Sequence, residues 1–227
     1  MKHFCKLFVY ILIISFTTLL NPVELTNSCY STNINPDTTE LKTDENNDST
    51  VLEGTSANVV YYNQKDPKWA DKIYGGNNTI SVYGCGPTTL AMLVSSLTEE
   101  TLTPDQMAKW AYDNGYFCEN SGSYHSIIPE GAAKWGLNVQ SVTDYSFDNI
   151  TSLMSTGNLI VVLMGNGHFT ENGHFLILRG VTLDGKLLIA DPASWENTQK
   201  QWDTEIIINE AKYGCGNGGP MWSVSIY

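Results

Sequence analysis

The chain has 227 residues, of which 24 are acidic and 12 are basic, so its formal net charge is −12. A charge of this sign and size argues against nucleic acid as a partner, because binding to a phosphate backbone needs clustered lysine and arginine. The length allows one folded domain or two smaller ones.

The first residues, 1–28, are predicted to be a secretory signal peptide. Two lysines in "MKHFCK" precede a mostly apolar run at 7–20, which is shorter than the roughly 20 residues of a membrane span. Thr26 and Ser28 supply small residues for a cut before Cys29. We therefore expect a secreted or cell-surface protein without a stable membrane span. A lipid-anchored Cys29 is the less favoured alternative, because the preceding "ELTNS" is polar.

Residues 29–58 are predicted to be a disordered acidic spacer. From Ser31 onward this segment contains no aromatic residue, six acids and a single lysine. Such a composition cannot bury enough apolar surface to offset the entropy lost on ordering. The folded domain is then expected to cover 59–227 and to be a monomer.

Four helices are predicted in the first part of this domain, over 87–97, 103–115, 129–136 and 146–157. The first has apolar residues at helical spacing on one stripe, with Pro87 tolerated in its first turn. The second begins with Thr103 and Gln106 at the spacing of a capping box, and the two shorter helices are each ended by a glycine.

After these helices the pattern changes to strands, predicted over 158–164, 174–183, 186–192 and 222–227. Asp184–Gly185 is a turn signal that joins two of them into a hairpin. Helices therefore come first and an antiparallel sheet second, which predicts an α+β fold.

Three cysteines fall in the predicted domain: Cys85, Cys118 and Cys215. Because the number is odd in a protein expected to be exported, one disulfide and one free thiol is the simplest arrangement. Cys118 and Cys215 both lie in loop sequence rich in glycine and asparagine, so they are the candidate disulfide. Cys85 is then the free thiol.

Cys85 lies in "YGCGPTTLAML", at the start of the first predicted helix. Unpaired N–H groups and the helix dipole at such a position stabilise a thiolate, which makes the cysteine a candidate nucleophile. Gly84 and Gly86 are expected to leave room for a substrate to bind beside it. The alternative is a small buried hydrophobic residue.

A thiolate nucleophile needs a base with an orienting group. His174 and Asp191 lie on the two strands of the predicted hairpin, but an ideal register, at about 3.4 Å per residue, leaves them too far apart. A wider turn or a bulge, plausibly at Gly180, must shift the register. His168 lies in a glycine-rich loop that suits a role in substrate binding, whereas His125 is expected to be structural.

Gln64, in "YYNQKDPKW", could donate its amide to an oxyanion, or could be a surface residue before a turn. A zinc site at His168 and His174 lacks third and fourth ligands at suitable spacing, and no cofactor is expected.

The motifs "NQKDPKW", "YGCGPTTLAML", "GHFLILRGV" and "IADPAS" together resemble the C39-like peptidases of the papain-like cysteine-protease clan. The resemblance covers nearly all of the predicted domain. It implies a papain-like fold whose nucleophile helix precedes the sheet, with Cys85 as nucleophile, His174 as base and Asp191 as orienting acid. It also assigns Gln64 to the oxyanion hole, and implies a peptide or protein substrate.

The resemblance is to the secreted, stand-alone branch, so the double-glycine specificity of exporter-linked members is not carried over. Two alternatives remain open. One is a cell-wall amidase on the same scaffold, for which the six tryptophans could form a binding surface, although core packing is their default role. The other is a non-catalytic secreted binding module that keeps the fold.

Overall fold

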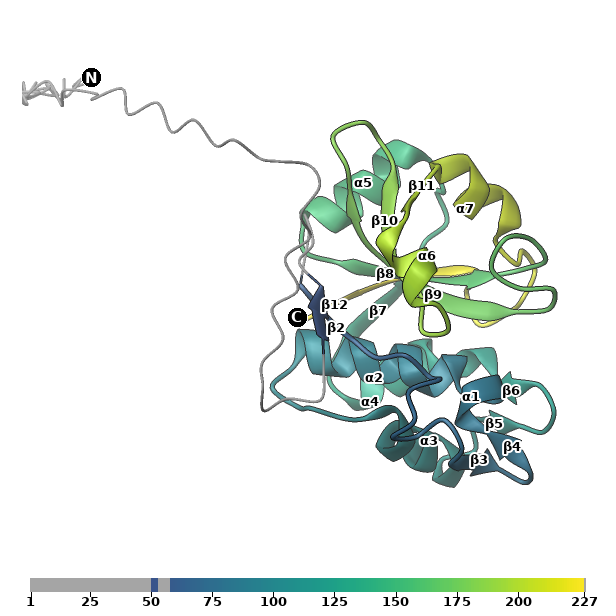
Figure 1. The fold of residues 1–227 in the computed structure, drawn as a ribbon. Coiled ribbons are helices and arrows are strands. Elements are labelled where there is room, and N and C mark those ends of the chain that lie inside the picture. The colour runs from purple at the N-terminus through teal and green to yellow at the C-terminus, as the bar shows by residue number, and fades with distance from the viewer. Residues whose placement is uncertain (1–49, 53–57, 227) are drawn as a thin grey trace, which may run out of the picture. The chain divides into compact units, whose positions relative to one another are not determined.

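The computed structural model describes residues 50–52 and 58–226 (Figure 1). The predicted signal peptide, most of the predicted spacer and Tyr227 lie outside the described residues. Within the described part of the chain, no helix is both long and apolar enough to cross a membrane.

The helices are α1 (Ile80–Tyr83), α2 (Cys85–Leu97), α3 (Pro104–Asp113), α4 (Pro129–Lys134), α5 (Phe147–Ser155), α6 (Trp195–Gln199) and α7 (Thr204–Glu210), with a 3₁₀ turn at His125–Ile127. The strands are β1 (Thr50–Leu52), β2 (Val59–Tyr61), β3 (Ile73–Gly75), β4 (Asn78–Thr79), β5 (Phe117–Cys118), β6 (Gly122–Ser123), β7 (Asn138–Ser141), β8 (Leu159–Met164), β9 (His174–Val181), β10 (Leu187–Ala190), β11 (Gln201–Trp202) and β12 (Met221–Ser225).

Six strands form one antiparallel sheet in the order β11-β10-β9-β8-β12-β7. Its central strand β8 is buried throughout, and its side chains alternate between two cores because successive residues of a strand point to opposite faces. Leu159 and Val161 pack with α2, α3 and α4 on one face. Ile160 and Val162 pack with α5 and α7 on the other. Figure 1 shows these two helical layers on either side of the sheet.

The predicted α+β fold is confirmed, and all four predicted helices are present. Helix α2 begins two residues before its predicted start, so that Cys85 is its first residue and Pro87 lies in its first turn. At α3, the side-chain oxygen of Gln106 accepts a hydrogen bond from the Thr103 N–H (2.9 Å), as expected for a capping box.

The hairpin of β9 and β10 contains the register shift that the sequence requires. The Thr182 N–H donates to the Lys186 carbonyl (2.8 Å), so the turn is wider than two residues. Leu188 then pairs with Gly180 but Ile189 pairs with Leu178, so a bulge lies next to Gly180, as predicted. Because Leu178 now lies opposite Ile189, the register has moved by two residues from the ideal one.

Residues 50–52, which fall within the predicted spacer, form strand β1. This strand pairs antiparallel with β2, with Thr50 opposite Tyr61 and Leu52 opposite Val59. Composition missed it because the pairing uses backbone hydrogen bonds, which an acidic, aromatic-poor segment can still form. This strand therefore lies before the predicted domain boundary at residue 59.

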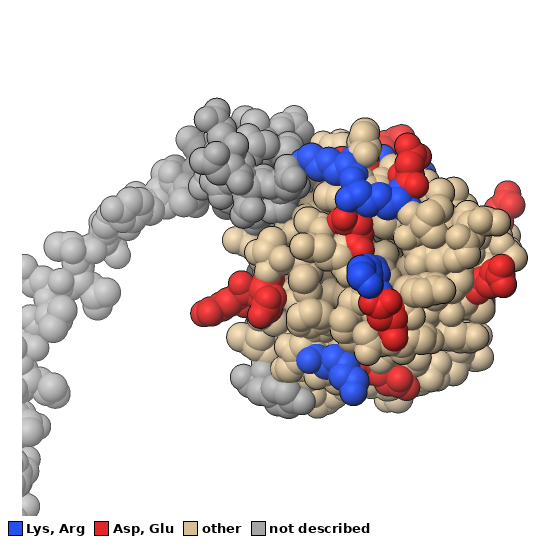
Figure 2. All heavy atoms as spheres, turned by 90° about the horizontal axis from the view of Figure 1, so that it is seen from below, with Lys and Arg blue, Asp and Glu red and all other residues tan. Residues whose placement is uncertain are grey.

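The described surface carries basic and acidic side chains close together. Figure 2 shows them interspersed on the face seen from below. Among the ion pairs are Lys72–Asp105 (2.5 Å) and Lys109–Asp113 (2.6 Å). Exposed pairs of this kind contribute at most about 1 kcal/mol each to stability.

Candidate active site

Cys85 occupies the first position of α2, and its side chain is partly buried against the core. Gly84 precedes it as the N-cap, and no acidic side chain lies in the first turn of the helix. The free N–H groups of this turn therefore face the thiol without a competing carboxylate. The side chain of Cys85 lies close enough to His174, the first residue of β9, for the two groups to shift each other's pKa.

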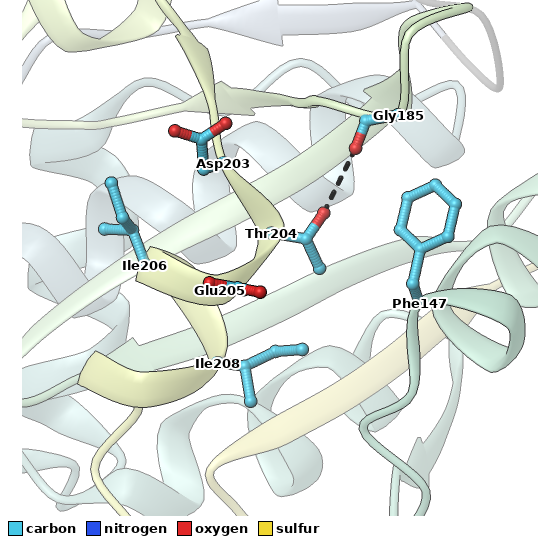
Figure 3. Close-up of a pocket in the computed structure, with 7 residues that line it drawn as sticks. All are labelled: Phe147, Gly185, Asp203, Thr204, Glu205, Ile206 and Ile208. Carbon is cyan, nitrogen blue, oxygen red and sulfur yellow. Dashed lines mark hydrogen bonds between the residues drawn. The ribbon is translucent and has the colours of Figure 1, made fainter.

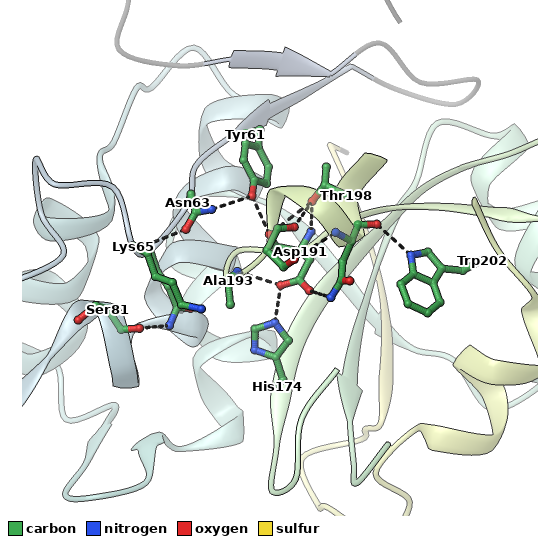
Figure 4. Close-up of polar contacts among 12 residues, drawn as sticks. Tyr61, Asn63, Lys65, Ser81, His174, Asp191, Ala193, Thr198 and Trp202 are labelled. Carbon is green, nitrogen blue, oxygen red and sulfur yellow. Dashed lines mark hydrogen bonds and ion pairs between the residues drawn. The ribbon is translucent and has the colours of Figure 1, made fainter. Parts of the chain in front are cut away.

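His174 is buried, with 6% of its surface exposed. Its Nε2 lies 2.7 Å from the Oδ1 of Asp191, to which it donates a hydrogen bond (Figure 4). With Nε2 occupied in this way, Nδ1 is the ring nitrogen left for Cys85. The imidazole is thus held between a carboxylate on one side and a thiol on the other.

Asp191 follows the end of β10 and is only 1% exposed. Its Oδ1 also accepts from the Ala193 N–H (2.8 Å), and its Oδ2 accepts from the Nδ2 of Asn197 (2.9 Å). Burial alone would raise the pKa of this carboxyl, but the hydrogen bonds and the charge of His174 lower it below its ordinary value. Asp191 is therefore a buried, ionised acceptor.

The same contacts shift the pKa values of the other two side chains in opposite directions. Burial would raise the pKa of the Cys85 thiol, but the hydrogen bond and charge of His174, with the backbone N–H groups of Phe175 and Gly86, lower it. Burial would lower the pKa of His174, but Asp191 and Cys85 raise it. An arrangement of this kind favours a thiolate beside an imidazolium.

Gln64 lies just after β2 and is buried, with 3% of its surface exposed. Its backbone N–H donates to the Pro192 carbonyl (2.7 Å), and its Nε2 donates to the Ser81 carbonyl (2.9 Å). The side-chain nitrogen Nε2 carries two hydrogens, so one of them remains available as a donor after the bond to Ser81. The hydroxyl of Tyr61 donates to the Asp191 carbonyl (2.9 Å; Figure 4), so this segment has one hydrogen bond to Asp191 and one to Pro192.

Sequence reasoning did not find three of the residues that surround Asp191: Tyr61, Asn197 and Thr198. The Thr198 hydroxyl accepts from the Asp191 N–H (2.9 Å). The available signal was the short helix α6 directly after Asp191–Pro192, with Ser194 as its N-cap accepting from the Asn197 N–H. A helix that is capped at Ser194 has its first turn, which includes Asn197, close to Asp191.

The surroundings of Gly84 and Gly86 indicate a packing role, and their predicted part in substrate binding stays a prediction. Both are buried, and an added Cβ would lie 2.5 Å from the Ile80 carbonyl oxygen at Gly84 and 2.5 Å from the Ser123 Oγ at Gly86. Protein atoms already fill this space. The glycines instead let α1 and β6 approach the start of α2 closely.

We expect Gly86→Ala to lower the free energy of unfolding by about 1–3 kcal/mol, because a Cβ there overpacks a buried contact. Urea unfolding measures the change. Ser123→Gly in the same chain should restore most of the loss, and a double-mutant cycle with Ser123→Gly alone separates this coupling from the lost Tyr74–Ser123 hydrogen bond (2.8 Å). Unchanged stability of Gly86→Ala would show that the Ser123 side chain can move aside without a measurable cost.

His168 contacts residues other than those of the candidate triad. Its backbone N–H donates to the Oε2 of Glu210 (2.7 Å), its Nδ1 is bonded to the Oε1 of the same carboxylate, and its ring packs on Trp202. These contacts involve Glu210 and Trp202, and neither Cys85 nor His174 takes part in them. Its proposed part in substrate binding stays a prediction.

The candidate disulfide is not formed, and Cys118 and Cys215 are free thiols. Cys118 lies in the β5–β6 hairpin opposite Gly122. The carbonyl of Cys215 is instead 2.8 Å from the Nδ1 of His125, which gives that histidine the structural role expected of it. The two cysteines were paired from composition alone, which carries no information about their separation in space.

A pocket elsewhere on the surface is lined by neither a cysteine nor a histidine. It is lined by Phe147, Gly185, Asp203, Thr204, Glu205, Ile206 and Ile208 (Figure 3). Its polar groups are two carboxylates and a threonine whose hydroxyl donates to the Gly185 carbonyl (3.3 Å). Within the described residues, no group of three or more histidine, cysteine or acidic side chains could hold a metal ion.

The chain is similar to the Peptidase_C39-like family, whose model matches residues 56–214. The match covers well over half of the chain, so the protein belongs to this family, and its mixed helix and antiparallel-sheet architecture is consistent with a papain-like fold. At the level of the family it is a peptidase-type hydrolase. A comparison with curated proteins finds no match.

Proposed function

We propose that this protein is an exported cysteine peptidase that hydrolyses amide bonds with Cys85, His174 and Asp191. The observation that carries the proposal is the imidazole of His174, held between the thiol at the start of α2 and a buried carboxylate at 2.7 Å. The pKa of the thiol is lowered and that of the imidazole is raised. This is the polarity that a nucleophile and its proton donor need.

In the first half of the proposed reaction the Cys85 thiolate attacks the carbonyl carbon of a substrate amide. The negative charge moves to the carbonyl oxygen, where the Cys85 backbone N–H and the free Nε2 hydrogen of Gln64 stabilise it. The C–N bond then breaks as the Nδ1 proton of His174 passes to the leaving amine, which leaves a thioester on Cys85 and a neutral imidazole.

In the second half, His174 removes a proton from water and the resulting hydroxide attacks the thioester. Collapse of this intermediate breaks the C–S bond, releases the carboxylic acid and restores the thiolate–imidazolium pair. Asp191 remains ionised throughout, and orients the imidazole by accepting the Nε2 hydrogen.

Peptides or proteins are the substrate class we favour over cell wall. The wall alternative relied on tryptophans as a binding surface, but Trp69, Trp202 and Trp222 are buried and the other three are partly buried. The three tryptophans that are buried in the core are not available for stacking on a sugar polymer. Release of soluble fragments from a peptidoglycan preparation, without cleavage of peptides, would favour the amidase instead.

The proposal is tested by the rate at which iodoacetamide alkylates Cys85 between pH 4 and 9, in the wild type and in His174→Ala. In the wild type we expect rapid alkylation well below pH 8. In His174→Ala we expect the rate at pH 6 to fall about 100-fold or more, because an ordinary thiol with a pKa near 8.5 is only about 0.3% ionised there.

Peptide mapping of the same samples provides an internal control. The thiol of Cys215 has its pKa raised by burial, so its slow alkylation should be the same in both proteins. A wild-type Cys85 that reacts only near pH 8.5, unaffected by His174→Ala, would contradict the proposed function and favour a binding module. Since the site depends on a free thiol, the assays need a reducing buffer.

A further inference from the structure

The acid of the proposed triad has a partner of its own on the opposite side from His174. The Nδ2 of Asn197 donates to the Oδ2 of Asp191 at 2.9 Å, while the Oδ1 accepts from His174 and Ala193 at 2.7 and 2.8 Å. We propose that Asn197 is a positioning residue of the reaction, which fixes the plane of the Asp191 carboxylate and through it the imidazole of His174. The inference rests on the proposed function.

Asn197 is itself held in place by its backbone. Its N–H donates to the Ser194 Oγ (3.1 Å), and its carbonyl accepts from the indole Nε1 of Trp202 (2.9 Å). Trp202 is 9% exposed and packs against Phe169, with ring centroids 4.4 Å apart. Asn197 therefore joins α6 to β11, and its amide can be aimed at Asp191 with little conformational freedom.

The geometry of the carboxylate explains why this second contact matters. Rotation of the carboxylate about the Cβ–Cγ bond of Asp191 moves both oxygens, so each of the three hydrogen bonds restrains it. The bond from Asn197 is the side-chain contact that restrains it from the Oδ2 side. Because the Nε2 hydrogen of His174 follows the Oδ1 lone pair, a turned carboxylate would tilt the imidazole away from Cys85.

The electrostatics of the site also support a positioning role for Asn197. The charged and titratable groups that face Asp191 are His174 from β9 and the hydroxyl of Tyr61 from β2, with Cys85 beyond the imidazole. After the contribution of His174, the hydrogen bond from Asn197 also lowers the pKa of Asp191. The amide thus helps to keep the carboxylate ionised in a buried site, where it would otherwise lose solvation.

The test is the pH profile of Cys85 alkylation by iodoacetamide in three single variants, Asn197→Ala, Asn197→Asp and Asn149→Ala. Asn197→Ala removes the donor. Asn197→Asp keeps the shape but restores a donor only when its carboxyl is protonated. Asn149→Ala is the matched control, because Asn149 is also partly buried and its Nδ2 donates to a backbone carbonyl, that of Asp144 (2.7 Å).

We expect Asn197→Ala to reduce the alkylation rate at pH 6 by about tenfold, the size of effect that losing one hydrogen bond to a charged group has on an equilibrium. Asn197→Asp should lose at least as much at pH 7 but recover toward the wild-type rate below about pH 5, where its carboxyl gains a proton. Asn149→Ala should follow the wild-type profile.

A purely structural role for Asn197 would lower the unfolding temperature of the variants without moving this profile or producing recovery in acid, and that result would overturn the inference. If Asn197→Ala does not fold, the isosteric Asn197→Asp decides the question alone. A wild-type Cys85 with an ordinary thiol profile would overturn the proposed function and this inference together. An activated wild type with an unchanged Asn197→Ala would overturn only the inference.

Discussion

Cys85→Ala is expected to abolish amide hydrolysis while leaving the fold intact. Removing the nucleophile of an acyl-transfer enzyme costs on the order of 10⁴-fold or more in turnover, because no other group in the site can form the thioester. The side chain is small and partly exposed to the site, so its loss leaves only a minor cavity. Cleavage of a defined peptide mixture, followed by mass spectrometry, measures the loss.

The two other free cysteines of the described domain supply matched controls. Cys118→Ala and Cys215→Ala remove thiols outside the proposed triad, one in the β5–β6 hairpin and one beside His125, so both variants should keep the wild-type rate. Circular dichroism and thermal unfolding of Cys85→Ala should superimpose on those of the wild type. Hydrolysis that persists in the purified Cys85→Ala protein would rule out Cys85 as the nucleophile.

Asp191→Ala is expected to damage both activity and stability. It leaves the Nε2 hydrogen of His174, the Ala193 N–H and the Asn197 amide without their acceptor in a buried site. Breaking one side of a buried charge pair typically costs about 3–5 kcal/mol. Loss of the orienting acid typically reduces turnover by about 10⁴-fold, because the imidazole no longer holds the correct tautomer.

Asp191→Asn separates the charge from the shape. Its oxygen can still accept from His174, but its NH₂ would face the NH₂ of Asn197, so two donors would meet. We expect a smaller loss of stability than in Asp191→Ala and an intermediate loss of turnover. Peptide cleavage and urea unfolding give the two quantities. Wild-type turnover and stability in Asp191→Ala would show that the carboxylate has no part in the site.

The contribution of Asp191 to stability should depend on pH in a defined direction. The pKa of Asp191 is lowered in the folded state, so its contribution is present above the unfolded value of about 3.9 and is lost as the pH falls through the folded value. The pKa of His174 is raised, so its contribution is complete below about 6.5 and is lost as the pH rises through the folded value. The stability difference between wild type and Asp191→Ala should therefore be largest between about pH 4 and 6.5.

Local patterns in the sequence predicted the elements and the general class of the fold. The apolar stripe of α2, the capping residues of α3 and the continuous apolar run of β8 each depend on neighbours close in the chain, so they can be read without tertiary structure. The position of Cys85 at a helix N-terminus followed from the same reasoning. Gln64 was assigned only by the resemblance to a family, since a lone glutamine before a turn has no pattern of its own.

What the sequence by itself determined is therefore the order of the elements, the residue at the start of α2 and, with the family motifs, the residues to look for in the site. Only the tertiary structure decided that His174 and Asp191 meet, because their distance depends on the bulge beside Gly180. It also decided that Asn197 contacts the acid and that Cys118 and Cys215 are free thiols. These contacts join residues from separate elements, and register and packing, which no local pattern encodes, set the distances between them.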